Sequence, residues 1–469
     1  MSQRPALVLP GVTLAVTLLA AWLVYGTVSG EALLGFDGYP LIAASAFHSI
    51  ADPLAVFGDE LMGGRYPDGR FYRPIVHLTF GVDHALGGLD PAQYARTDIA
   101  LAALTSTLLG LLASALAGAR GWTAAAVTAC AAATYLLHPA QLEVVPYAPR
   151  RADALAVLFT VAAALAVVRD TRPLWTALLA LCALLSKESG VIVVPVTFAA
   201  ALCRPDARGV GAALRSAAGP AAGVAAGMVL RTIVLGGLGG HAESGAPGTS
   251  SLGGITRSLW EAVSADAPGG GALLGLLAVA ALALLMGARG KGPGRATALL
   301  VVLWAGSAVA ITSLSGRFHD WYALGLVAPL AVLGGVAAGG ARRAAGAPIG
   351  LAILGLVVTG HLGSPQRDTL GVAQAVSADQ SSRFVALLEA TAPGTTTTFE
   401  PWVFAVSTAP GAPPVFVHAP YSLSALGELI LGPDVEVICV AVDPPLPAPD
   451  LIHVQLIPGP PPAATLAPR

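Results

Sequence analysis

The sequence predicts an α-helical polytopic membrane protein with about eleven transmembrane helices, followed by a small α/β domain at its C-terminal end. The composition indicates the membrane class: 55% of the 469 residues are hydrophobic, only 11% are charged, and the mean hydropathy is +0.73, whereas about a quarter of a soluble domain is charged. Apolar segments recur at roughly the 17 to 25 residues that cross a bilayer. After residue 363 the hydropathy falls, and short β-rich runs replace these segments.

The apolar segments locate the expected transmembrane helices. The first is interpreted as an uncleaved helix, because no small-residue cleavage pattern follows it. The fifth and sixth are short and share the turn Ser186-Lys187-Glu188-Ser189. The expected helices are 6–28, 95–118, 121–139, 152–168, 173–186, 189–203, 211–236, 271–288, 296–314, 320–339 and 347–362.

Basic residues in the short loops predict the orientation, because Lys and Arg gather on the cytoplasmic side of a membrane protein. With a cytoplasmic N-terminus, that side collects Arg4, Arg120, Arg169, Arg172, Arg204, Arg208, Arg289, Lys291, Arg295, Arg342 and Arg343. Residues 1–362 then form the transmembrane domain of a multi-pass cell-membrane protein. Within it, residues 29–94 form the first extracytoplasmic loop.

The C-terminal part is predicted to lie outside the cytoplasm as a compact α/β domain of residues 363–457, since roughly a hundred residues suffice for a small domain. The pattern predicts helices at 372–390 and 422–431, and strands within 396–406, 414–417, 435–442 and 452–457. The Pro-rich stretch 458–469 is predicted to be a disordered tail.

Polar clusters on the predicted outer side are candidate functional sites, because ionisable residues at membrane depth are rare and usually functional. They lie in the first outer loop and where later helices enter or leave the lipid. The clusters are Phe36-Asp37-Gly38-Tyr39-Pro40, Phe71-Tyr72-Arg73-Pro74, His138-Pro139-Ala140-Gln141-Leu142-Glu143, Arg150-Arg151-Ala152-Asp153, Ser186-Lys187-Glu188 and Gly316-Arg317-Phe318-His319-Asp320-Trp321-Tyr322.

These motifs, in this order, carry a family resemblance. The segments FDGYPLI, FYRPIVHLTFGVDHALGGLDPAQY, LHPAQLEVVPYAPRRADAL, LLSKESGVIVVP and GRFHDWYALGL together resemble the multi-spanning C-type (GT-C) glycosyltransferases. The likeness is strongest to the O-mannosyltransferases with tetratricopeptide repeats and their bacterial relatives, and it covers about residues 1–340. It implies a GT-C-like fold and transfer of a sugar, with mannose as the family's example, from a polyprenyl-monophosphate carrier to an acceptor on the outer face.

The resemblance also implies a role for Asp37, which matches the position of the acidic residue that acts as base on the acceptor hydroxyl. Relatives often carry two consecutive acids there, whereas this chain has Asp37-Gly38. A metal site built on such a pair is therefore less supported. The tetratricopeptide repeats are replaced by the C-terminal domain, so a protein acceptor is not carried over from the family.

The residue types fit this chemistry independently. Transfer from a sugar phosphate with inversion needs a base for the acceptor proton and cations for the leaving phosphate. Asp37 can supply the base, because it is expected at the boundary between water and the low-dielectric interior of the membrane. The candidate phosphate-binding cations are Lys187, Arg73, Arg151 and Arg317, because Lys and Arg bind phosphate as a point charge and as a bidentate fork. The remaining candidate substrate-binding residues are Glu188, His138, Glu143, Tyr72 and Asp153.

Each assignment has a structural alternative. Asp37 can simply cap the next helix, and Lys187 with Glu188 can form an ordinary pair at a turn. Arg73 can be an interfacial anchor, and His138 can cap a helix end. Glu143 can orient Arg151 or close a loop, while Arg151 and Asp153 can mark the membrane boundary. Arg317 can belong with His319 and Tyr322 to an aromatic belt.

The implied partners are the lipid bilayer, a polyprenyl-phosphate-sugar donor and a glycan, protein or lipid acceptor, with no nucleic acid. No cofactor is assigned. A divalent metal lacks a clear ligand cluster, because His138, His241 and His319 lie in separate loops. The alternative function is a transporter or flippase for lipid-linked or small polar solutes, although such proteins place ionisable residues near the bilayer midplane and show internal repeats. A non-catalytic scaffold is a third alternative.

Overall fold

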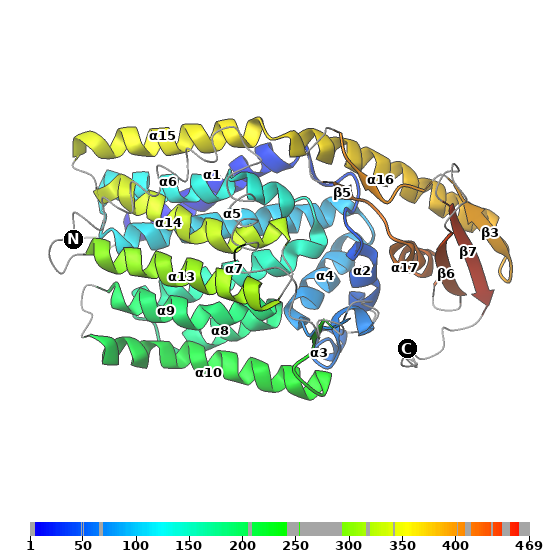
Figure 1. Cartoon of the computed structure of the whole chain (residues 1–469), viewed down its shortest axis with the longest axis horizontal. Coiled ribbons are helices and arrows are strands. Elements are labelled where there is room, and N and C mark those ends of the chain that lie inside the picture. The colour runs from blue at the N-terminus through cyan, green and yellow to red at the C-terminus, as the bar shows by residue number, and fades with distance from the viewer. Residues whose placement is uncertain are drawn as a thin grey trace.

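A computed structural model describes most of the chain, namely residues 5–47, 49, 51–64, 69–204, 209–241, 253, 293–315, 319–340, 343–400, 402–408, 414–432, 435–442 and 451–458. Long helices lie side by side in one part of the molecule, and a small sheet with neighbouring helices lies at one end of them (Figure 1). The expected helix 271–288, Arg317 and the tail after residue 458 lie outside the described residues.

Among the described elements, two short strands lie between helices, and the other strands follow the long helices. The helices are α1 (Pro5–Tyr25), α2 (Gly38–Ser45), α3 (Asp52–Ala55), α4 (Pro74–Gly87), α5 (Pro91–Leu116), α6 (Gly121–Leu136), α7 (Arg151–Val168), α8 (Pro173–Ser186), α9 (Val193–Leu202), α10 (Val210–Leu235), α13 (Pro293–Ser315), α14 (Leu324–Gly340), α15 (Arg343–Leu362), α16 (Pro365–Ala390) and α17 (Pro420–Leu431). The strands are β1 (Gly69–Arg70), β2 (Gly240–His241), β3 (Thr396–Phe399), β4 (Ala405–Val406), β5 (Val415–Phe416), β6 (Val435–Val442) and β7 (Leu451–Pro458).

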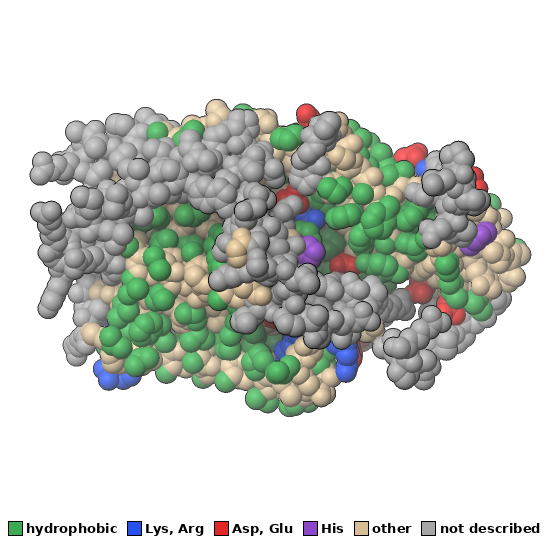
Figure 2. Space-filling model, viewed as in Figure 1, with side chains coloured by type: hydrophobic (Ala, Val, Ile, Leu, Met, Phe, Trp, Pro, Cys, Tyr) green, Lys and Arg blue, Asp and Glu red, His purple; other side chains and the backbone are tan. Residues whose placement is uncertain are grey.

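Apolar side chains point both inward and outward from the long helices. The inner cluster joins α5, α6, α7, α9, α13 and α14 around the buried Tyr135 and Trp304. Other large apolar side chains are exposed, including Leu19 and Leu23 of α1 and Ile233 of α10. Figure 2 shows hydrophobic side chains over much of the visible helical surface. An apolar exterior of this kind suits lipid rather than water.

Small residues let α8 and α10 pack closely. A Cβ added to Gly223 would lie 2.0 Å from the carbonyl oxygen of Ala177, and one added to Gly219 would lie 2.7 Å from that of Pro173. These two glycines are four residues apart, so they lie on one face of α10. Close helix contacts built on small residues are common in membrane proteins.

A helix is present at each of the expected membrane-spanning ranges within the described residues. By length and composition, four helical stretches among these residues are suited to crossing a membrane: Pro91–Leu116, Ala148–Val168, Val210–Leu235 and Trp321–Gly339. The stretches 9–25, 173–186, 188–202 and 297–313 are apolar but shorter. The membrane-protein character predicted from composition is confirmed, whereas the count of eleven spans stays a prediction.

The first predicted outer loop contains more structure than the sequence indicated. It includes α2, the short α3 and the 14-residue α4, which begins at Pro74. Proline suits the first turn of a helix, because that position needs no backbone N–H donor. Helices α2 and α4 lie between the long helices and the C-terminal sheet (Figure 1).

The C-terminal part contains a three-stranded antiparallel sheet in the order β3-β7-β6, and β4 pairs with β5. Helix α17 packs on β6 and on α2. A Cβ added to Gly427 would lie 2.7 Å from the side chain of Val437, so glycine allows the close approach of α17 to the sheet. These elements match the predicted secondary structure, while the domain boundary and its extracytoplasmic location stay predictions.

Candidate functional site

The predicted Ser186-Lys187-Glu188-Ser189 turn forms one side of the site. Helix α8 ends at Ser186, Lys187 is extended, and a 3₁₀ turn runs from Glu188 to Ile192 before α9 begins. A Cβ added to Gly190 would lie 2.3 Å from the backbone of Ala183. The turn can therefore fold back against α8 only because residue 190 is glycine, which fixes where the two preceding charged side chains begin.

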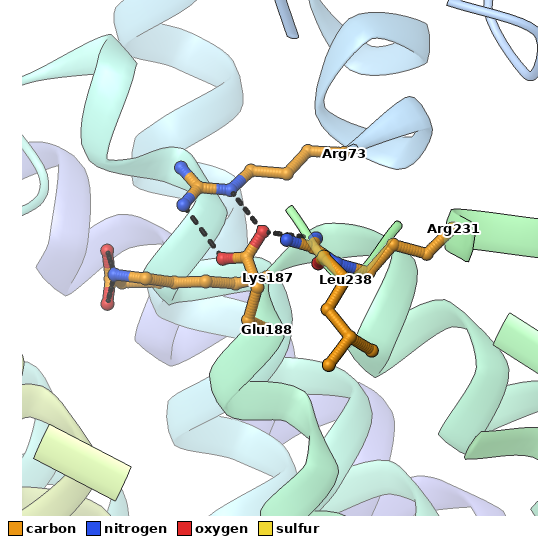
Figure 3. Close-up of polar contacts among 6 residues, drawn as sticks. Arg73, Lys187, Glu188, Arg231 and Leu238 are labelled. Atoms are coloured by element: carbon orange, nitrogen blue, oxygen red, sulfur yellow. Dashed lines mark hydrogen bonds and ion pairs between the residues drawn. The ribbon is translucent and has the colours of Figure 1, made fainter. Parts of the chain in front are cut away.

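The Glu188 carboxylate joins two arginines from distant parts of the chain. Arg73 donates a 2.8 Å hydrogen bond to Oε2, and Arg231 of α10 donates a 2.7 Å bond to Oε1. Arg231 also donates to the carbonyl of Leu238 at 2.7 Å. Figure 3 shows both guanidinium groups converging on this carboxylate. Two cations are thus held side by side by one acid.

Lys187 points the other way from the same turn and pairs with Asp153 of α7. Its Nζ lies 2.5 Å and 2.6 Å from the two carboxylate oxygens, and 4.3 Å from the centre of the Tyr322 ring. Burial lowers the pKa of Lys187 below its ordinary value, and the Asp153 carboxylate opposes that shift. The carboxylate and the ring face both favour the charged ammonium.

These residues line a cavity of about 500 Å³ between α7, α8, α10, α13 and α14. Its described charged lining residues are Arg73, Lys187, Arg231, Asp153 and Glu188. Three cations and two carboxylates leave one positive charge in excess. The rest of the lining is mainly apolar and includes Leu184, Met228 and Ile311. A cavity of this size holds a small ligand, and its charge favours an anionic group next to an apolar one.

A second cavity, of about 160 Å³, contains Asp37. The two cavities share five lining residues, which are Phe71, Arg73, Asp153, Lys187 and Tyr322. Asp37 precedes α2, but its side chain makes no capping hydrogen bond to that helix, so helix capping does not account for it. Its Oδ1 accepts a 2.7 Å hydrogen bond from the hydroxyl of Tyr421. The structure therefore brings Asp37, Lys187 and Arg73 to one cavity.

Arg151 does not line either of these two cavities. Its fully buried side chain lies 2.7 Å from Asp83 and 2.7 Å from Asp98, and packs over the ring of Phe80. It joins α4, α5 and α7 as a structural ion cluster. Its role as a phosphate ligand, inferred from sequence, has no support from this position, because two carboxylates already surround the guanidinium.

Three other sequence candidates have local structural contacts. His138 accepts a hydrogen bond from the backbone of Ala140 and caps the turn that follows. Glu143 pairs with Arg150, at 2.6 Å, rather than with Arg151 as one interpretation held. Tyr72 donates to the carbonyl of Phe57 at 2.8 Å, while its neighbours Phe71 and Arg73 line the cavities, because successive side chains of an extended segment point to opposite sides.

The sequence analysis missed Arg231 and Tyr421, and it assigned no role to Arg150 and Trp321, although both stand in its polar clusters. Arg231 had a usable signal, because an arginine inside the apolar segment 211–236 needs a partner. Arg150 stacks between the rings of Tyr147 and Trp321, at 3.8 Å and 4.0 Å. Tyr421 lies 384 positions from Asp37, and nothing in its local sequence marks it.

The described part of the chain contains no group of three or more His, Cys, Asp or Glu side chains arranged to hold a metal ion. Among the described residues that line the larger cavity, Arg73, Lys187 and Arg231 have side chains that can bind a phosphate directly.

Comparison with known proteins supports the motif-based resemblance. No family model matches the chain. The chain is 34% identical over 139 residues to the protein O-mannosyl-transferase TMTC2 of Mus musculus, and 33% identical over 139 residues to that of Homo sapiens. The predicted resemblance to O-mannosyltransferases is confirmed. The match covers 27% of this chain and only 16% of each relative.

The chain also has a likeness to the solved structure of ArnT from Cupriavidus metallidurans in the apo state. The likeness covers 81% of this chain and 71% of that one, with 15% sequence identity and a TM-score of 0.39. This score is too low to define a shared fold.

Proposed function

We propose that this protein is a membrane glycosyltransferase that transfers a sugar from a polyprenyl-monophosphate carrier to an acceptor hydroxyl on the extracytoplasmic face. The observation that carries the proposal is that Arg73, Asp153 and Lys187 line both a larger, mainly apolar cavity and a smaller cavity that contains Asp37. A lipid-linked donor needs a cavity with an apolar lining, such as the larger one. A hydroxyl acceptor needs a base nearby, such as Asp37 in the smaller one.

The donor phosphate would lie in the larger cavity, whose described lining carries one positive charge in excess. Arg73 and Arg231 present two guanidinium forks on the same carboxylate, and such forks match the geometry of a phosphate. The apolar lining suits the prenyl chain. As the sugar leaves, negative charge grows on the phosphate, and cations already in place stabilise it without reorganisation.

Asp37 would act as the base in the smaller cavity. The acceptor oxygen attacks the anomeric carbon, its proton passes to the Asp37 carboxylate, and the bond to the phosphate oxygen breaks with its electron pair remaining on the phosphate. Because the acceptor approaches from the side opposite the phosphate, the anomeric configuration inverts. The names of the relatives make mannose the first hexose to test, with glycan, protein and lipid acceptors.

The test is transfer of labelled sugar from polyprenyl-phosphate donors to endogenous acceptors in membranes that contain the protein. Asp37→Asn should lower transfer by about 100-fold or more, the usual effect of losing a general base. The matched control is Asp59→Asn, because Asp59 is exposed in the same segment and lines neither cavity. Equal transfer by the wild type and Asp37→Asn would contradict the role of Asp37. Solute or lipid movement without transfer would favour the transporter.

A further inference from the structure

The segment that carries Asp37 is held by the C-terminal part of the chain. Gln374 of α16 accepts hydrogen bonds from the backbone N–H groups of Glu31 and Ala32, at 3.0 Å and 2.7 Å. Ser377, one turn further along α16, donates to the carbonyl of Leu33 at 3.1 Å. Helix α16 therefore satisfies three backbone groups within six residues of Asp37.

Strand β5 contacts the two residues that precede Asp37. The backbone N–H of Gly35 donates to the carbonyl of Phe416 at 3.0 Å. Phe36 packs against Phe404 and Phe416, with ring centres 4.6 Å and 4.9 Å away. Phe416 also lines the cavity that contains Asp37. The C-terminal segment is thus part of the wall on the acceptor side.

Tyr421 makes the direct contact. It lies in the first turn of α17, next to the buried Ser422 and Leu423, and α17 packs on both α2 and β6. Its hydroxyl lies 2.7 Å from Oδ1 of Asp37. A phenol stays protonated at neutral pH, so it acts as the donor. The carboxylate has about four acceptor positions, and the bond from Tyr421 occupies one of them.

We propose that Tyr421 is a positioning residue for Asp37, so that the C-terminal segment completes the acceptor side of the site. The catalytic role of Asp37 in this inference rests on the proposed function. A hydrogen bond from Tyr421 fixes the rotation of the carboxylate and stabilises its charged form. Asp37 then stays ionised, and ready to take a proton, at a lower pH than it would without Tyr421.

The test compares Tyr421→Phe with Tyr39→Phe in the full-length protein. The Tyr39 hydroxyl lies at the same interface but contacts Ser381, at 3.3 Å. The first readout is the pH dependence of carbodiimide labelling of Asp37, followed by mass spectrometry, because this reagent reacts with the protonated carboxyl. In Tyr421→Phe the midpoint should move up by about one pH unit, as the loss of one charge-assisted hydrogen bond predicts. Tyr39→Phe should match the wild type.

The second readout is sugar transfer. Tyr421→Phe should lower kcat by about tenfold near neutral pH and move the acidic limb of the rate profile upward, with the donor KM unchanged. An unchanged labelling midpoint in Tyr421→Phe, with melting as in the wild type, would overturn the inference. If the labelling midpoint shifts in Tyr421→Phe but the wild type transfers no sugar, the positioning of Asp37 by Tyr421 would be supported and the proposed function would be rejected.

Discussion

The ammonium of Lys187 lies 2.5 Å and 2.6 Å from the two carboxylate oxygens of Asp153, at the wall that two cavities share. Both side chains are largely buried. A pair in this position has two effects that experiments can separate. It holds α7 against the turn that follows α8, and it presents a fixed positive charge to whatever occupies either cavity.

Removal of Lys187 alone should therefore affect both stability and transfer. Lys187→Met leaves Asp153 as a buried, unpaired acid, and breaking such a pair typically costs about 3 to 5 kcal/mol. The double variant Lys187→Met/Asp153→Asn should recover most of the free energy of unfolding but stay at least tenfold slower in transfer. Recovery of both properties in the double variant would show that the pair is only structural.

Arg73 should be sensitive even to a change that keeps its charge. Arg73→Lys loses the planar fork that contacts both oxygens of Glu188, and lysine does not replace arginine at bidentate sites. We expect kcat/KM for the donor to fall about 10- to 100-fold, measured with purified protein. Arg70→Lys is the matched control, because Arg70 is more than half exposed and pairs with Glu60 away from the cavity. A similar loss in both variants would contradict a specific role for Arg73.

Arg151 should behave as a structural residue. Arg151→Ala leaves Asp83 and Asp98 buried without their shared cation, which should cost about 3 to 5 kcal/mol of stability. Thermal unfolding in detergent measures this loss. Protein that remains folded at low temperature should bind the donor with normal affinity. A normal melting temperature together with weakened donor binding would instead support the phosphate-binding role inferred from the sequence.

The C-terminal segment should weaken in acid because of His418. This side chain is fully buried beside Ser377 and Ser381, and burial lowers the pKa of His418 to about 4. Between pH ~6.5 and ~4 the unfolded chain binds a proton that the folded chain does not, so stability falls as the pH falls and then levels off. The effect amounts to at most about 3 kcal/mol.

The measurement is the melting temperature of the wild type and of His418→Gln between pH 7.5 and 4.5. The variant lacks the titrating ring, so its melting temperature should fall less over this range. Parallel curves for the two proteins would show that the pKa of His418 is the same in the folded and the unfolded state, and would contradict this prediction.

The sequence predicted the long helices well, because their apolar length is a local property. It also predicted the charged turn at Lys187, whereas the role of Asp37 stays a prediction. It did not distinguish Arg150 from Arg151, since that depends on where a 3₁₀ turn ends and α7 begins. At this junction Arg150 lines the smaller cavity, whereas Arg151 is buried between α4, α5 and α7.

Long-range contacts account for the other omissions. The partners of Glu188 come from residues 73 and 231, and the partner of Asp37 from residue 421. No spacing rule connects such positions, because the approach of distant elements is fixed by packing between helices. Helices α2 and α4 were missed for a related reason: with 8 and 14 residues they are too short to cross a membrane, and they pack against elements distant in the sequence, such as α17 and α8.

The most direct test of the account measures donor binding and transfer in the same Asp37→Asn protein. Asp37 does not line the larger cavity that would hold the donor phosphate; it lines the smaller one. The variant should therefore bind a polyprenyl-phosphate sugar as tightly as the wild type and yet transfer it at least 100-fold more slowly. Transfer at the wild-type rate, or loss of donor binding equal to the loss of transfer, would contradict the assignment of Asp37 as the base.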